Sequence, residues 1–270
     1  MDLGLEGKHA IVTGGSKGIG KAIARELARE GVDVAIVARS RDQLESTAKE
    51  LAAETKRRVI PLVADVTSKE QVDRMVAEAA ERLGGLHILV NSGSPPGGTA
   101  TGPIETVIDE DLLQDFNVKY VGALRCVRAA IPFLKQQGWG RIVNISGTNA
   151  RNAGNLSGGA RNGALVHFTK TLAVHLGRFG ITVNCVHPGQ TRTERTPSLL
   201  AARAAELGVT PEEAERRDYV PDSPRGNAIG RMVDAAEIAY VTAFLASEKS
   251  WSISGELIVA TGGAGRSVYY

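Results

Sequence analysis

The sequence contains few of the residues on which several classes of protein depend. Its 270 residues include only two cysteines, Cys126 and Cys185, each within an apolar segment. Two thiols do not supply a disulfide framework or a cysteine-ligated metal site, so both are expected to be reduced core residues. The five histidines show no i, i+4 pairing with a carboxylate partner, and no metal site is expected from them.

Long apolar runs and clusters of one charge are also missing. No stretch of about 18 apolar residues occurs, so no membrane span is expected. The first residues include Asp2 and Glu6 instead of a basic segment, which argues against a signal peptide and for a cytoplasmic protein. The formal net charge is +2 and basic residues are dispersed, so we expect a small-molecule partner and neither nucleic acid nor membrane.

The residues that are present describe one globular α/β domain spanning 1–270. Apolar residues make up 43% of the chain and charged residues 23%. Seven short runs are apolar without alternation, as buried parallel strands are, at 9–13, 32–37, 59–63, 86–90, 141–145, 181–186 and 257–259. Helical patterns separate them at 19–30, 41–54, 69–82, 110–135, 161–176 and 234–246. This order predicts a doubly wound Rossmann fold, with a seven-stranded parallel sheet, helices on both faces, and ligands at the carboxyl ends of the strands.

One segment interrupts the alternation of strands and helices. Residues 191–231 contain Pro197, Pro211, Pro221 and Pro224, together with a charged, helix-like stretch at 211–217. A connection of this length between two strands usually folds over a site. The segment is therefore interpreted as a substrate lid within the single domain.

A glycine-rich loop follows the first expected strand and runs directly into an expected helix. It reads Thr13-Gly14-Gly15-Ser16-Lys17-Gly18-Ile19-Gly20. Glycines at positions 14, 18 and 20 permit a tight turn and a close approach of the backbone to a pyrophosphate at the helix N-terminus. Glycine-rich turns also arise for purely steric reasons, but the flanking strand and helix favour a dinucleotide site.

The residues after the second expected strand indicate which dinucleotide binds. A protein that binds NAD places an acidic residue about 20 positions beyond the loop, on the adenosine ribose hydroxyls. This sequence has Arg39 and Ser40 there. Arg39 can hold a 2′-phosphate through charge-assisted hydrogen bonds, and Lys17 adds a second cation, so NADP(H) is predicted. The alternative is that Arg39 is a solvated strand end.

At these residues the sequence resembles the short-chain dehydrogenase/reductase family, and the resemblance extends over essentially the whole chain. The family's Thr-Gly-x-x-x-Gly-x-Gly element appears at 13–20. The resemblance implies substrate-side groups at Ser146 and Asn117. It also implies cofactor contacts at Asp65, Val66, Asn91, Gly93, Pro188, Gly189 and Thr193. A homodimer or homotetramer, paired through the helices at 110–135 and 161–176, is a further implication.

Two elements depart from the family pattern. The family's Asn-Asn-Ala-Gly is altered to Asn-Ser-Gly-Ser at 91–94 and continues with Pro-Pro-Gly-Gly at 95–98, which predicts a reshaped loop beside the substrate. The family's Tyr-x-x-x-Lys pair falls on Gly158 and Asn162. The sequence has no tyrosine between positions 120 and 219 and no lysine between positions 135 and 170, so the usual proton donor is absent.

Several side chains are candidates to replace that donor. Ser146 is the best placed by family position, but a hydroxyl is a poor acid, so Ser146 would act by orienting a water. Arg161 could stabilise an oxyanion, although a solvent-facing arginine is more common. His167 is expected to point away from this helix face. Tyr120 and His187 are expected to be packing or structural residues.

Two functions are compatible with these residues. The first is an NADP(H)-dependent oxidoreductase that transfers hydride to or from a carbonyl or an activated double bond with a non-standard proton donor. The alternative is a catalytically inactive NADP(H)-binding sensor or a scaffold protein. The same glycine loop serves the oxidoreductase and the sensor, and only turnover of NADPH distinguishes them.

Overall fold

The computed structural model of the chain describes residues 1–94, 98–100, 102–220, 223 and 225–265. Its centre is a parallel sheet in the order β3-β2-β1-β4-β5-β6-β9. These strands are β1 (His9–Thr13), β2 (Asp33–Ala38), β3 (Val59–Val63), β4 (Ile88–Asn91), β5 (Gly140–Ile145), β6 (Ile181–Pro188) and β9 (Leu257–Ala260). All seven expected strands are present and pair in parallel, which confirms the predicted sheet.

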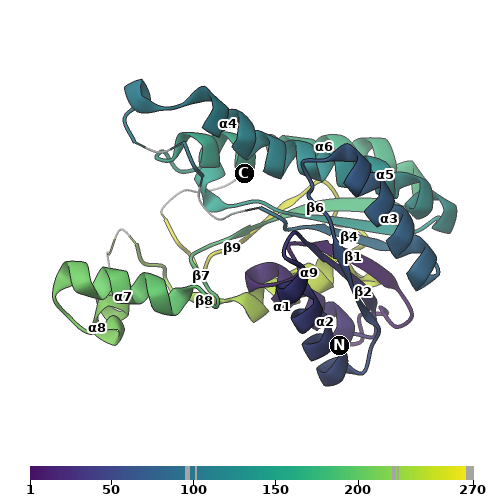
Figure 1. The fold of residues 1–270 in the computed structure, drawn as a ribbon, viewed down its shortest axis with the longest axis horizontal. Coiled ribbons are helices and arrows are strands. Elements are labelled where there is room, and N and C mark those ends of the chain that lie inside the picture. Colours follow the sequence, from purple (N-terminus) through teal and green to yellow (C-terminus); the bar gives the residue numbers. More distant parts are fainter. Residues whose placement is uncertain (95–97, 101, 221–222, 224, 266–270) are drawn as a thin grey trace.

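Helices cover both faces of this sheet (Figure 1). One face carries α1 (Gly18–Arg29), α2 (Arg41–Thr55) and α9 (Ala235–Leu245), and the other carries α3 (Lys69–Leu83), α5 (Gly122–Gln137) and α6 (Leu156–Leu176). Each face has its own apolar core. Val12 belongs to the first core and its neighbour Ile11 to the second, which explains why the strands are apolar without alternation. No helix in the described part of the chain is long and apolar enough to cross a membrane.

The single helix expected at 110–135 is three elements in the structure. α4 (Asp109–Phe116) leads into a π-helical turn (Asn117–Val121), and α5 follows it directly. Such turns are rare and occur frequently at functional sites. Because the π turn interrupts the 3.6-residue repeat, it changes the direction of the side chains around it. An uninterrupted helical pattern therefore misplaces the side chains near Asn117.

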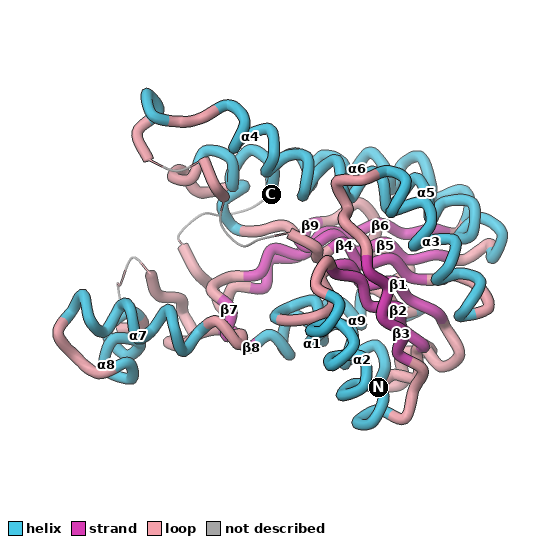
Figure 2. The backbone as a smooth tube through the Cα atoms, viewed as in Figure 1, coloured by secondary structure: helices cyan, strands magenta, loops and turns pink. Residues whose placement is uncertain are grey.

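A two-helix arm projects from the body of the molecule within the segment interpreted as a lid (Figure 2). It consists of α7 (Thr196–Leu207) and α8 (Pro211–Asp218). A short parallel pair, β7 (Thr191–Arg192) and β8 (Val233–Asp234), joins the two ends of this segment, and the sequence did not indicate that pair. The prolines at 221 and 224 lie outside the described residues, and so do the prolines at 95 and 96.

The sheet topology selects one edge for ligand binding. The strand order reverses between β1 and β4, so the connections that follow these two strands leave in opposite directions. Ligands of open α/β sheets bind in the crevice beyond the carboxyl ends of the strands at such a point. The loops after β1 and β4 meet there, and they form the first part of the candidate site.

Candidate functional site

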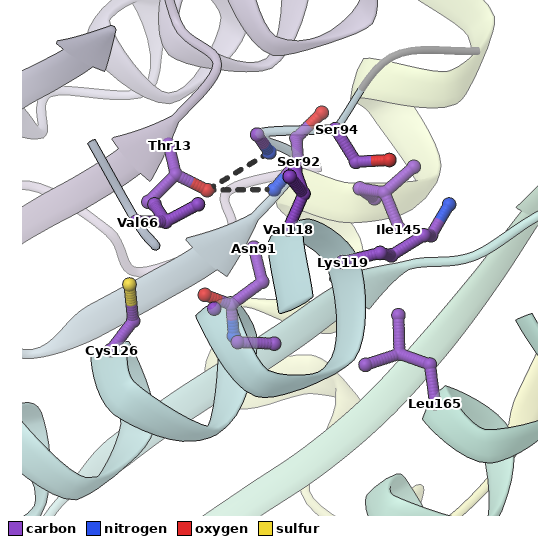
Figure 3. Close-up of a pocket in the computed structure, with 13 residues that line it drawn as sticks. Thr13, Val66, Asn91, Ser92, Ser94, Val118, Lys119, Cys126, Ile145 and Leu165 are labelled. Atoms are coloured by element: carbon purple, nitrogen blue, oxygen red, sulfur yellow. Dashed lines mark hydrogen bonds between the residues drawn. The ribbon is translucent and has the colours of Figure 1, made fainter. Parts of the chain in front are cut away.

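The glycine loop after β1 packs directly against the loop after β4. Gly14 has a φ of +69°, and a Cβ there would lie 2.7 Å from the carbonyl oxygen of Ser92. A Cβ on Gly20 would lie 2.2 Å from the carbonyl oxygen of Gly14, so this close approach requires glycine. Thr13 Oγ1 accepts hydrogen bonds from the backbone N–H groups of Ser92 and Gly93, each at 3.0 Å (Figure 3). These bonds fix the two loops relative to each other.

The first turn of α1 already holds a carboxylate group. The backbone N–H of Gly18 donates to Oε2 of the exposed Glu194 at 2.8 Å. Backbone N–H groups at a helix N-terminus favour anions, because they lack helical partners and lie at the positive end of the helix dipole. The position that Glu194 occupies therefore suits a pyrophosphate oxygen. Ser16 is buried in the same loop, and its carbonyl oxygen accepts from Thr47 Oγ1 at 2.9 Å, while Ile19 is half-buried.

Exposed cations lie next to this loop. The two cations are Lys17 in the loop and Arg39 after β2. Ser40, which follows Arg39, is exposed as well. Asp65, at the end of the neighbouring strand β3, is half-buried and ionised. Burial alone would raise the pKa of Asp65, but hydrogen bonds from Thr67 and the positive charges of Arg39 and Arg125 lower it.

These residues test whether a phosphorylated dinucleotide fits the site. The loop requires glycine where its backbone approaches other backbone atoms closely. A backbone N–H at the start of α1 holds the carboxylate of Glu194, and two exposed cations lie beside the loop. Val66, the neighbour of Asp65 in the sequence, packs against α5. A Cβ on Gly122 of α5 would lie 2.9 Å from Val66 Cγ2. The residues present fit NADP(H).

The elements after β6 complete this part of the site. A Cβ on Gly189, which follows Pro188, would lie 2.9 Å from Thr261 Cα, so the turn packs against the end of β9. The Thr193 backbone N–H donates to Thr196 Oγ1 at 2.9 Å. Thr193 also faces the first turn of α1, with its Cγ2 3.6 Å from the position of a Cβ on Gly18. The structure thus brings the predicted cofactor residues Gly18 and Thr193 together.

A small pocket opens beside the junction of the two loops (Figure 3). It is lined by Thr13, Val66, Asn91, Ser92, Gly93, Ser94, Val118, Lys119, Gly122, Ala123, Cys126, Ile145 and Leu165. Asn91 is part of its rigid wall. Asn91 Nδ2 donates to Asn144 Oδ1, and Asn144 Nδ2 donates to Thr169 Oγ1, each at 2.9 Å. This buried chain of polar groups ties β4 and β5 to α6.

Lys119 lies in this pocket, and Asn117 does not. Lys119 Nζ donates to the carbonyl oxygen of Ser146 at 3.1 Å, and Figure 3 shows the side chain extending toward Ile145. Asn117 Oδ1 instead accepts from Arg125 Nη1 at 2.9 Å, against α5. Asn117 was expected to lie on the substrate side together with Ser146, and in the structure it is Lys119 of the π turn that contacts Ser146. The sequence signal that could have pointed to Lys119 as a site residue is a lysine within a largely apolar helical stretch.

The surroundings of Lys119 change its protonation. Burial, reinforced by the positive charge of Arg161, lowers the pKa of Lys119 to about 7, while Cys185 and Asp115 act in the opposite direction. His187 of β6 is 1% exposed. Its pKa is lowered to about 4 by burial and by the charges of Arg151 and Lys119, so it is neutral at pH 7. Its Nε2 has no hydrogen-bond partner among the described residues, although the sequence favoured a satisfied structural histidine.

Gly158 and Asn162 belong to the first turns of α6 and are both buried. The Gly158 N–H donates to Asn155 Oδ1, the helix cap, at 2.6 Å. The loop after β4 presses on this turn, because a Cβ on Gly98 would lie 2.7 Å from Gly158 N. Ser146 Oγ donates to the carbonyl oxygen of Asn162 at 3.0 Å. The Ser146 hydroxyl proton is therefore already engaged with the helix.

Arg161 is buried in an ion pair, whereas the sequence left it either facing solvent or stabilising an oxyanion. Its Nη1 lies 3.1 Å from Asp115 Oδ1, and the two side chains are 1% and 6% exposed. Thr99 N and Ser157 Oγ donate to Asp115 Oδ2 at 2.7 and 2.5 Å. Burial alone would raise the pKa of Asp115, but these hydrogen bonds and Arg161 lower it. The pair links α4 to α6 beneath the site.

The remaining candidates have packing roles or lie outside the site. Tyr120 contacts Phe168 edge-on, with ring centroids 5.5 Å apart, and His167 is exposed. Cys126 and Cys185 are free and buried, as expected, and burial raises the pKa of each thiol to about 12. Within the described ranges, no group of three or more His, Cys, Asp and Glu side chains is placed to hold a metal ion.

Known proteins resemble this chain along nearly its full length. The family described as short chain dehydrogenase matches residues 8–204. Short-chain reductase protein NovJ of Streptomyces niveus is 32% identical over 255 residues, which cover 94% of this chain and 92% of NovJ. NADPH-dependent reductase BacG of Bacillus subtilis (strain 168) is 31% identical over 264 residues, covering 97% and 99%. L-sorbose reductase of Gluconobacter frateurii, solved with NADPH and L-sorbose, has a TM-score of 0.90 and 28% identity, covering 99% and 100%.

Proposed function

Because the chain belongs to the short-chain dehydrogenase family, we propose that it reduces a small molecule at a carbonyl or an activated double bond, using NADPH and a non-standard proton donor. The observation that carries this proposal is the pairing of an anion-binding N–H at Gly18 with the exposed cations Lys17 and Arg39. Anionic groups of a phosphorylated dinucleotide require this combination.

NADP(H) is the cofactor. The reductase BacG is NADPH-dependent, and the L-sorbose reductase structure contains NADPH. In this chain the Gly18 N–H would hold the pyrophosphate after Glu194 moves away, and Arg39 with Lys17 would hold the 2′-phosphate. When bound, the cofactor supplies the hydride. Asn91 and Gly93 would line the cofactor at the pocket, and Thr193 would bind its carboxamide.

The substrate would lie above Ser146, at the carboxyl edge of β5. Gly158 and Asn162 stand where the family has its tyrosine and lysine, and neither side chain is an acid or a cation. A positioned general acid contributes roughly 10²–10⁴ in rate, so a reductase at this site needs a different donor. The arm formed by α7 and α8 is positioned to act as the substrate lid, since β7 and β8 fix both of its ends to the body.

Turnover of NADPH tests the proposed function. The purified protein is incubated with NADPH and three probes: 9,10-phenanthrenequinone, ethyl acetoacetate and 2-cyclohexen-1-one. We expect loss of NADPH absorbance with at least one probe, and the product from 2-cyclohexen-1-one shows whether the carbonyl or the double bond is reduced. Binding of NADPH without turnover across the panel would support the sensor instead, and no NADPH-induced rise in melting temperature would support a scaffold.

We also propose that the protein is a homodimer or homotetramer. Val174 on α6 and Leu113 on α4 are apolar side chains that are 72% and 65% exposed, and they lie on the helices through which the pairing of subunits is proposed. Sedimentation is expected to give a mass that is a multiple of the 28.5 kDa of one chain. A species of 28.5 kDa alone would contradict an oligomer.

A further inference from the structure

The geometry places a lysine amine at the substrate side of the site. Lys119 sits on the π turn, is half-buried, and lines the pocket together with Ser92, Gly93 and Ile145. Its Nζ is 3.1 Å from the Ser146 carbonyl oxygen. A protonated amine has three N–H donors, and this oxygen accepts one of them. Among the described residues the other donors remain free for a substrate.

Charged and titratable groups act on Lys119 from three of the surrounding elements. Asp115 approaches from α4, Arg161 from α6, and Cys185 and His187 from β6. Asp115 is held in its ion pair with Arg161, and its two oxygens receive further hydrogen bonds from Thr99 and Ser157. Among the described residues, no carboxylate pairs directly with Lys119 to fix its proton. Its amine can exchange that proton near neutral pH.

The other groups at this site are poorly suited to give a proton to a substrate. Ser146 Oγ already donates to Asn162 O. His187 is neutral at pH 7 because its pKa is lowered to about 4. The pKa of Cys185 is raised to about 12 by burial, and an arginine does not give up its proton in proteins. Among these described groups, Lys119 is the one whose acid form is populated and whose proton is transferable at pH 7.

We propose that Lys119 is the catalytic residue that protonates the substrate oxygen, in place of the tyrosine that α6 lacks. This inference rests on the proposed reductase function. As the carbonyl carbon gains the hydride, the carbonyl π electrons move to oxygen. An O–H bond forms there as one N–H bond of the Lys119 ammonium breaks. The product is the alcohol, and the neutral amine regains a proton from water.

The proposed role fixes the direction of the pH dependence. Reduction requires the ammonium form of Lys119, so kcat/KM for carbonyl reduction falls as the pH rises through the pKa of this amine. Burial lowers that pKa to about 7 in the free protein, far below the value of about 10.4 for an exposed lysine. The falling limb of the profile must therefore be missing when Lys119 is replaced.

Three lysine variants test the role through activity with 9,10-phenanthrenequinone and NADPH. Lys119→Met is expected to lose roughly 10²–10⁴ in kcat/KM and to lose the alkaline falling limb. Lys119→Arg keeps the charge without a transferable proton, so it is expected to be as slow as Lys119→Met. Lys170→Met, at an exposed lysine of α6, is the matched control and is expected to match the wild type. NADPH affinity, measured by calorimetry, is expected to stay unchanged in all three.

Three results separate a failure of this inference from a failure of the proposed function. If the wild type oxidises NADPH and Lys119→Met does so at the same rate with the same pH profile, the inference fails alone. If Lys119→Arg retains wild-type activity, Lys119 supplies only charge and the inference also fails. If the wild type turns over no probe, the proposed function and the inference fail together.

A measurement on the cofactor-free protein tests the same group without activity. In protein labelled with carbon-13 lysine, the Cε signal that disappears in Lys119→Met belongs to Lys119. We expect this signal to titrate near pH 7, well below the value of about 10.4 for a lysine in water. A Lys119 signal that titrates together with those of the other lysines would overturn the inference, and Lys119→Arg gives the same assignment if Lys119→Met does not fold.

Discussion

The two ends of the site are built in different ways. At the cofactor end, the loop from β1 to α1 is shaped by its own glycines, because Gly14 and Gly20 allow backbone segments to approach within distances that a Cβ would not permit. At the substrate end, the arrangement depends on side chains that are distant in sequence, such as Asp115 with Arg161 and Lys119 with Ser146. The glycines that shape the first end lie within one short segment. The second exists only when α4, β5 and α6 are assembled.

This difference predicts where each kind of substitution acts. Changes in the glycine loop should alter cofactor binding while the substrate end stays intact. Changes in the buried pairs should alter the stability of the whole domain, because these pairs connect separate elements. The four variants below test this separation, beginning with the largest expected effect.

Asp115→Ala is expected to lower the free energy of unfolding by about 3–5 kcal/mol, because it leaves the Arg161 charge buried without its carboxylate. Urea unfolding followed by circular dichroism measures this loss. The control is Asp73→Ala, which removes an exposed partner of Lys69 and should change stability by less than about 1 kcal/mol. Adding Arg161→Met to Asp115→Ala should recover much of the loss. Equal losses at Asp115 and Asp73 would show that the buried pair does not hold the substrate end together.

Gly20→Ala is expected to raise the Kd for NADPH about 10- to 100-fold, because a Cβ 2.2 Å from the Gly14 carbonyl oxygen forces the loop to shift. This corresponds to the roughly 1–3 kcal/mol that overpacking costs. Gly163→Ala is the matched control, since it makes the same change within a helix where a Cβ has open space. Calorimetric titration with NADPH measures both. Unchanged affinity in Gly20→Ala would mean that the loop is not the cofactor cradle.

The sequence predicted most of the fold and the position of the glycine loop between β1 and α1, because both depend on local patterns. The strands are apolar on both faces and the glycines carry their own steric meaning, so each could be identified without knowing the rest of the molecule. The two-residue strands β7 and β8 are too short to produce a pattern and pair 42 positions apart, at Thr191 with Val233. Their pairing depends on how the arm leaves the sheet.

The substrate end was predicted less well, for physical reasons that differ from residue to residue. Helical periodicity contains no signal for the π turn, on which Lys119 reaches Ser146 while Asn117 contacts Arg125. Arg161 is separated from Asp115 by 46 positions, so its burial in an ion pair follows from the packing of α4 on α6. The lack of a partner for His187 Nε2 depends on every neighbouring element together.

Arg39→Ala is expected to raise the Kd for NADPH about tenfold and to leave the Kd for NADH unchanged, because only NADPH carries the 2′-phosphate. One charge-assisted hydrogen bond accounts for a change of about 1.5 kcal/mol. Arg41→Ala is the control, since Arg41 is equally exposed but pairs with Glu45 on α2. The ratio of the two Kd values measures the effect. An equal weakening for both dinucleotides would indicate that Arg39 acts on the common part of the cofactor or on the fold.

Glu194→Gln is expected to have the smallest effect and the opposite sign, tightening NADPH binding about two- to fivefold. In the free protein the Glu194 carboxylate accepts the Gly18 N–H, so the pyrophosphate must displace it and is repelled by its charge. A charge at a helix N-terminus contributes about 0.3–1 kcal/mol, and glutamine removes the charge while keeping the shape. Glu206→Gln, an exposed glutamate at the far end of α7, is the control. The gain should shrink as salt is added, because the repulsion is screened. A gain in NADPH affinity that is independent of salt would mean that the segment before α7 restrains the glycine loop sterically. The cofactor end would then depend on the arm of α7 and α8, just as the substrate end depends on its buried pairs.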